Sequence, residues 1–90
     1  MKVVVNRCFG GYNLSEEAYE YLGLPWTGYG LAYCDDRTNP KLVKCVETLG
    51  REANGSPAAD LRVIEIPDDV DWEINDYDGY ETIHEKHRVW

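Results

Sequence analysis

The strongest chemical signal in the chain is a run of carboxylates between Glu65 and Glu81. Of the 17 acidic residues, eight stand in this stretch with no Lys or Arg among them, and the other nine are balanced by the nine bases. Interspersed apolar and aromatic residues predict a folded anionic surface rather than a disordered tail. Such a surface attracts a basic partner, and the candidate contacts are Asp69, Asp71, Glu73, Asp76 and Asp78. The alternative is a solvated face that only keeps the protein soluble.

A second candidate site lies in the loop between the first predicted strand and the first predicted helix. Arg7 is suited to clamp a phosphate, because its guanidinium donates in a fork geometry that Lys lacks. Arg37 supplies a second cation just before the next predicted helix. The other candidate residues would stack on a base or bring loop amides close to a ligand, and they are Phe9, Gly10, Gly11, Tyr12, Trp26 and Tyr29.

These loop residues also have a purely structural interpretation. Gly10 and Gly11 without a longer phosphate-binding motif are a weak signal, so the loop is alternatively a tight turn whose aromatic residues complete the core. Arg37 is alternatively the ion-pair partner of Asp35 or Asp36, its near neighbours in the sequence.

No catalytic residue, cofactor or metal site is predicted. Glu81, His84 and His87 recur at three-residue spacing, which on a helix would place ligands on one face but on a strand alternates them between faces. Cys8 lacks the local signature of a catalytic nucleophile. The three cysteines are an odd number without Cys-x-x-Cys spacing, which favours reduced thiols over disulfides or structural zinc.

Length and composition predict one domain spanning residues 1–90, with 43% hydrophobic residues to build a core. No apolar run is long enough for a membrane span, and the N-terminus lacks a signal-peptide core, so we expect a cytoplasmic protein. Its acidity argues against direct nucleic-acid binding.

The elements that would position these residues follow from periodicity and caps. A strand is predicted at 2–6, and a helix begins at Ser15 or Asn13 with Leu14, Ala18, Tyr21 and Leu22 buried. Asn39-Pro40 begins a helix over 40–49. Further strands are predicted near 29–34 and at 61–66, 70–75 and 80–84, and residues 85–90 form a short helix or an extended arm. The order implies a small α+β fold, with a mixed or antiparallel sheet covered on one face by two helices.

Four segments carry a resemblance that covers nearly the whole chain: residues 5–12, 37–43, 66–79 and 85–90. They resemble a group of small uncharacterised proteins from bacteriophages and prophages. The resemblance implies a viral origin but brings no active site or cofactor. By analogy of setting, it suggests a counter-defence role.

Three functional hypotheses follow. The first is a non-enzymatic phage protein that sequesters a small nucleotide-like signal in the host cytoplasm, using Arg7 and Arg37. The second is an acidic inhibitor that imitates part of DNA's charge and blocks a basic groove of a host defence protein. The third is a small nucleotide hydrolase. A homodimer is possible if Trp26, Tyr29 or Trp90 covers a seam between two chains.

Overall fold

The α+β class predicted from the sequence is confirmed by the computed structural model, which describes residues 1–28, 36–55, 59–85 and 88–89. The strand predicted near 29–34 lies outside these residues. The elements, in chain order, are β1 (Lys2–Asn6), α1 (Glu16–Leu22), α2 (Pro40–Leu49), the 3₁₀ helix η1 (Gly50–Ala53), β2 (Leu61–Glu65), β3 (Glu73–Tyr77), β4 (Tyr80–Glu85) and β5 (Arg88–Val89).

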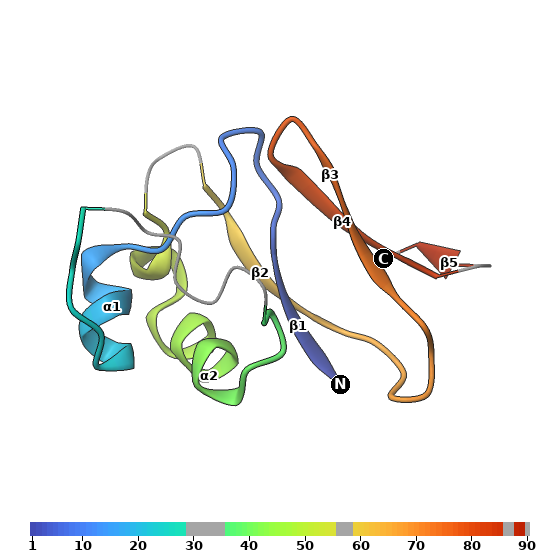
Figure 1. Ribbon diagram of the computed structural model, residues 1–90, viewed down its shortest axis with the longest axis horizontal. Helices are drawn as coiled ribbons and strands as arrows, with labels where there is room; N and C mark the ends of the chain where they lie inside the picture. Colours follow the sequence, from blue (N-terminus) through green and yellow to red (C-terminus); the bar gives the residue numbers. More distant parts are fainter. Residues whose placement is uncertain (29–35, 56–58, 86–87, 90) are drawn as a thin grey trace.

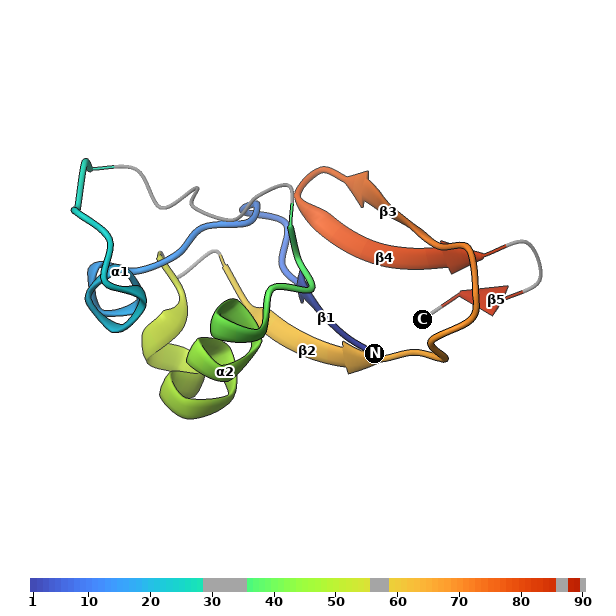
Figure 2. The ribbon, with the colours of Figure 1, turned by 60° about the horizontal axis from the view of Figure 1, so that its bottom comes forward.

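The strands are divided between two antiparallel sheets. One contains β1 and β2, with Val4 opposite Val63, and the other has the order β3-β4-β5. Figure 1 shows the β1–β2 pair in the middle, with the helices on one side and the β3–β4 hairpin on the other. The turned view in Figure 2 keeps this order of layers. The hairpin therefore forms a layer of its own.

The three consecutive valines of β1 alternate between two hydrophobic clusters. Val4 packs among buried residues of both helices, including Leu42. Val3 and Val5 point the other way and pack with Ile83 of β4. All three valines are fully buried, so the prediction that both faces of this strand are covered is confirmed. Continuous apolar runs are typical of strands buried on both faces.

Both helices begin and end at the residues that their caps indicate. The side chain of Ser15 accepts a hydrogen bond from Ala18 N, and that of Asn39 accepts one from Lys41 N. Gly23 ends α1 in the left-handed conformation, with φ 73°. The side chains of Ser15 and Asn39 thus satisfy backbone donors that have no partner within the helix. The predicted helix 40–49 is confirmed.

One predicted core residue of α1 was wrong. Tyr21 is 41% exposed, and Tyr19 is buried in its place. The buried stripe runs through Ala18, Tyr19 and Leu22, a spacing that repeats along one helix face. The ring of Trp26 packs edge-on against Tyr19, with 5.0 Å between the ring centroids.

The hairpin forms at the predicted turn. Asp78 has φ 53° and Gly79 has φ 92°, the pair of positive values that a two-residue Asp-Gly turn requires. The Asp76 carboxylate closes the turn by accepting from Gly79 N at 2.7 Å. β3 begins at Glu73 and not at Val70 as predicted. Two positions of the predicted C-terminal arm, Arg88–Val89, form β5 against the end of β4.

Candidate functional site on the hairpin

Arg37 is not available to a ligand in the way that its sequence position suggested. Its Nη1 and Nη2 donate to Glu81 Oε1 and Oε2 at 2.7 and 2.9 Å, and both residues are buried. Its guanidinium also lies 3.7 Å from the ring centroid of Tyr12. Of the two predicted ion-pair partners, Asp36 does not pair with Arg37, and its carboxylate accepts instead from the backbone and hydroxyl of Thr38. Asp35 lies outside the described residues.

The ion pair completes the edge of β1 that does not face β2. The backbone of Val4 donates to Arg37 O at 2.9 Å, and its carbonyl accepts from Arg37 Nη1 at 3.3 Å. Asn6 N donates to Glu81 Oε1 at 2.7 Å. Buried backbone groups need such partners, since each one left without a hydrogen bond costs free energy. Arg37 and Glu81 therefore have a structural role. Glu81 is buried, so it is not one of the exposed carboxylates of residues 65–81.

The loop that contains Gly10 and Gly11, here called the glycine loop, was predicted to contact a ligand. The tip of the β3–β4 hairpin lies against this loop instead. A Cβ atom on Gly79 would lie 2.4 Å from Gly11 N and 2.8 Å from Phe9 O, so only glycine allows this approach. The side chain of Asn6 donates to Gly79 O at 2.6 Å and holds the tip in place. Tyr12 is buried in the core. Gly11 and Tyr12 therefore fit the structural interpretation, in which the loop is a tight turn and its aromatic residue completes the core.

Arg7 and Phe9 instead lie beside two tyrosines of the hairpin. The Phe9 ring centroid is 5.3 Å from that of Tyr80 and 6.5 Å from that of Tyr77. The guanidinium carbon of Arg7 lies 5.7 Å from the centre of the Tyr80 ring. Phe9 is 60% exposed and Tyr77 is 78% exposed. We call Phe9, Tyr77 and Tyr80 the aromatic tip.

Neither hairpin tyrosine was predicted as a site residue, although the sequence holds a signal for both. A two-residue turn at Asp78 and Gly79 places Tyr77 directly opposite Tyr80, and cross-strand neighbours share one face of the sheet. The remaining ligand candidates do not join them. Gly10 is exposed, Trp26 packs on α1 at the helical end of the molecule, and Tyr29 lies outside the described residues.

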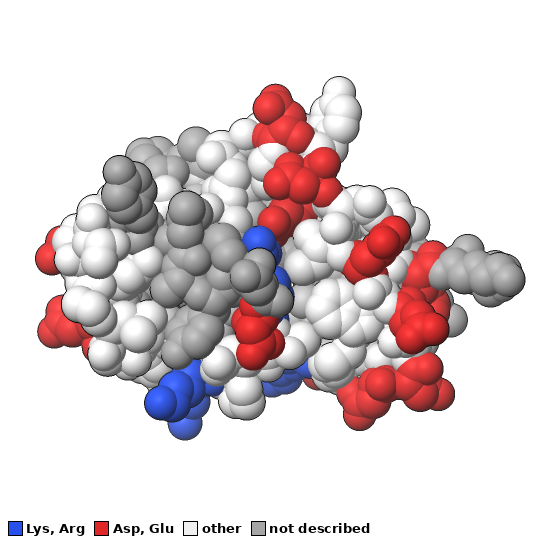
Figure 3. Space-filling view, viewed as in Figure 1, with Lys and Arg blue, Asp and Glu red and all other residues white. Residues whose placement is uncertain are grey.

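All five acidic residues predicted to contact a partner are exposed. With two exposed neighbours they make up what we call the acidic segment: Glu65, Asp68, Asp69, Asp71, Glu73, Asp76 and Asp78. Asp68 accepts from the N-terminal ammonium group. Figure 3 shows several acidic side chains over the hairpin end of this face and a few at the helical end, while the Lys and Arg side chains in view lie at the boundary and on the helical end. Because residues alternate along a strand, Glu73 and Tyr77 point outward on the same side of β3.

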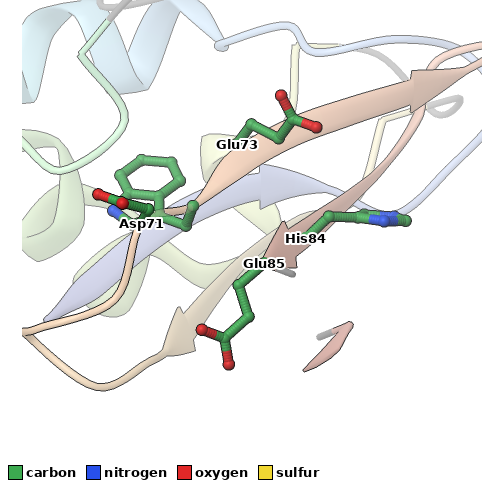
Figure 4. Close-up of a pocket in the computed structure, with 5 residues that line it drawn as sticks. Asp71, Glu73, His84 and Glu85 are labelled. Carbon is green, nitrogen blue, oxygen red and sulfur yellow. The ribbon is translucent and has the colours of Figure 1, made fainter. Parts of the chain in front are cut away.

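A shallow hollow of about 360 Å³ lies at the other end of the hairpin, lined by Asp71, Trp72, Glu73, His84 and Glu85. Figure 4 shows its labelled side chains spread around the hollow without converging on one point. No group of three His, Cys, Asp or Glu side chains within the described part of the chain could hold a metal ion. Glu81 and His84 point to opposite faces of β4, as expected on a strand, and His87 lies outside the described residues.

Two of the three cysteines are described, and both are free thiols. Burial raises the pKa of the Cys45 thiol, which lies in the core between the helices. A raised pKa reduces the thiolate fraction near neutral pH, so Cys45 has the character of a packing residue and not of a nucleophile.

Comparison with protein-family models, curated proteins and solved structures finds no match to this chain. No helix within the described ranges is long and apolar enough to cross a membrane. The candidate site combines the seven exposed carboxylates of the acidic segment, three of which lie in the β3–β4 hairpin, with the exposed rings of Phe9 and Tyr77.

Proposed function

We propose that the protein is a non-enzymatic binding protein that docks its β3–β4 hairpin onto a basic surface of another protein. The observation that carries this proposal is the combination of the exposed acidic segment with the exposed rings of Phe9 and Tyr77. Residues 65–81 contain no Lys or Arg to relieve the repulsion among these carboxylates. A surface that retains such repulsion is well suited to a partner of opposite charge.

The two kinds of side chain have different tasks in this proposal. The carboxylates attract and orient a basic partner over a range set by the Debye length, about 10 Å at 0.1 M salt. The rings of the aromatic tip supply apolar area that is buried on contact, and aromatic residues at the centre of an interface frequently dominate its affinity. Phe9 and Tyr77 are the exposed anchors, and the half-buried ring of Tyr80 packs against Phe9.

The resemblance to small phage and prophage proteins favours a particular setting for this activity. We infer that the protein acts in the host cytoplasm as a counter-defence inhibitor, and that its target is a host defence protein with a basic groove. Grooves that bind DNA are basic because each phosphate carries a negative charge. An acidic hairpin competes for such a groove without binding nucleic acid itself.

This proposal replaces sequestration of a nucleotide by Arg7 and Arg37. That hypothesis used Arg7 and Arg37 to bind the phosphate or ribose of the ligand, and Arg37 instead forms a buried ion pair with Glu81. Asp76 and Asp78, at the turn beside the aromatic tip, would repel a phosphate bound near Arg7.

The test compares two double variants that change the net charge equally. Asp71→Lys with Glu73→Lys, here called the hairpin variant, reverses charge in the acidic segment where it enters β3. Glu20→Lys with Glu52→Lys reverses two exposed carboxylates on α1 and η1. Each immobilised protein is exposed to a bacterial lysate, and retained proteins are quantified by mass spectrometry. We expect a basic protein that is retained by the wild type and by the α1–η1 variant but lost by the hairpin variant. Equal retention by both variants would refute the proposed face.

A further inference from the structure

A separate cavity lies where η1, the end of β1 and the start of β2 meet, and we infer that it binds a small sugar phosphate. Its volume is about 650 Å³, and its lining includes Cys8, Arg51, Asn54, Gly55, Asp60 and Arg62. An adjoining hollow of about 270 Å³ shares Arg51, Asn54, Asp60 and Arg62. This inference is independent of the hairpin proposal, because it uses none of the same residues.

The charge of this cavity is opposite to that of the protein as a whole. Two guanidinium groups face one carboxylate there, whereas the chain carries a net charge of -8. The backbone carbonyl of Arg51 accepts from Asn54 N at 3.1 Å, but its guanidinium makes no hydrogen bond or ion pair with any described residue. Arg62 donates through Nε and Nη2 to Asp60 at 3.1 Å each, which leaves Nη1 free to donate. Arginine is the side chain best suited to bind phosphate in a fork geometry.

The walls of the cavity are held in place before any ligand arrives. Asp60 N donates to Asn6 Oδ1 at 2.8 Å, and Asp60 O accepts from Arg7 N at 2.8 Å. Asn54 Oδ1 accepts from Leu61 N at 2.8 Å, so its Nδ2 remains as a donor. Because these hydrogen bonds fix the positions of Asp60 and Asn54, a ligand does not have to order them on binding.

The mixture of groups indicates the chemical class of the ligand. A phosphate would be bound by Arg51 and by the free Nη1 of Arg62. The carboxylate of Asp60 repels a bare anion but accepts hydrogen bonds from hydroxyl groups, which a sugar attached to the phosphate provides. The volume falls within the range of about 300–1,000 Å³ that is typical of small-molecule sites. These requirements together describe a ribose phosphate or a similar sugar phosphate.

The experiment is a titration of the isotope-labelled full chain with ribose 5-phosphate, followed by amide NMR shifts. We expect saturable shifts at Gly55, Asp60 and Arg62, and none with ribose alone. Arg51→Gln should weaken binding about tenfold or more, because a charge-assisted hydrogen bond is lost. Lys41→Gln, which removes the same charge from the far end of α2, should change the affinity by less than about twofold.

Unsaturable shifts with ribose 5-phosphate, equal shifts with ribose, or equal effects of the Arg51 and Lys41 variants would each overturn the inference. Because Arg51 is exposed, its variant should keep the wild-type pattern of core amide shifts, which verifies that it is folded. The Arg51 variant should also retain any partner of the hairpin, so failure at this cavity is distinguishable from failure of the hairpin proposal.

Discussion

Arg37 and Glu81 are 44 positions apart in the sequence and form a bidentate buried ion pair at the junction between β1 and the hairpin. The pair also supplies hydrogen bonds to the backbone of Val4 and Asn6. It therefore links the segment that leads into α2 with β4 across the outer edge of β1. The hairpin that carries the candidate site is oriented by this link.

Removing one member of the pair should destabilise the protein strongly. Glu81→Ala leaves a buried guanidinium without its carboxylate, and breaking a buried ion pair in this way typically costs about 3–5 kcal/mol. The free energy of unfolding, measured by urea denaturation, gives the cost. Lys2→Ala is the matched control, because the Lys2–Glu47 pair is about half exposed and an exposed pair contributes about 1 kcal/mol or less. Equal effects of the two substitutions would contradict a structural role for the buried pair.

Replacing Gly79 should loosen the hairpin tip. In Gly79→Ala the new Cβ atom would meet Gly11 N and Phe9 O, and the residue would also keep an unfavourable φ of 92°. Gly28→Ala is the control, since Gly28 has φ 90° and no atom of a described residue lies within 4 Å of the added group. We expect a loss of about 1 kcal/mol for Gly28→Ala from backbone strain alone. Gly79→Ala should cost at least about twice as much, because overpacking adds to this strain.

The amide shifts of Phe9, Gly11 and Tyr80 should move in Gly79→Ala and stay unchanged in Gly28→Ala. If the two variants have the same stability and the same spectra around the tip, the close approach of Gly79 to the glycine loop does not position the hairpin.

Cys45 should be unreactive in the folded protein. Its buried position raises the pKa of its thiol, so its thiolate fraction at about pH 8 is lower than that of an ordinary cysteine. Cys8 is only partly buried. Peptide mass spectrometry after brief alkylation should show Cys8 modified at least about tenfold faster than Cys45, with the difference lost in urea. Equal rates in the native protein would mean that the helical core opens readily.

Local signals predicted most of the fold. Asn39 and Pro40 start α2, Gly23 ends α1, and Asp78 and Gly79 close the hairpin, because caps and turns depend on neighbouring residues. The exposed acidic segment was predictable for a similar reason, since charge density is a property of the sequence itself. Tyr19 and Tyr21 show the limit of this approach, as either tyrosine is apolar enough to have been the buried one.

The contacts between distant segments were not predictable. Whether Arg37 binds a ligand, Asp36 or Glu81 depends on where β4 packs, and the sequence does not state that position. The same is true of the glycine loop, whose close neighbour is Gly79 of the hairpin. As a result, the sequence predicted a ligand site at Arg7 and Arg37, whereas the structure places the aromatic tip, with Tyr77 and Tyr80, beside Arg7.

The most direct measurement of hairpin docking is calorimetry between the purified protein and the basic partner that it captures, at about 50 and about 300 mM salt. The wild type should bind at least about tenfold more weakly at the higher salt, because screening removes the attraction of the carboxylates. Asp71→Lys with Glu73→Lys should abolish binding at either salt, and Phe9→Ala with Tyr77→Ala should weaken it about thirtyfold without changing the salt dependence. The Glu20–Glu52 reversal should bind as the wild type does. Unchanged affinity in the hairpin reversal would contradict docking through this face.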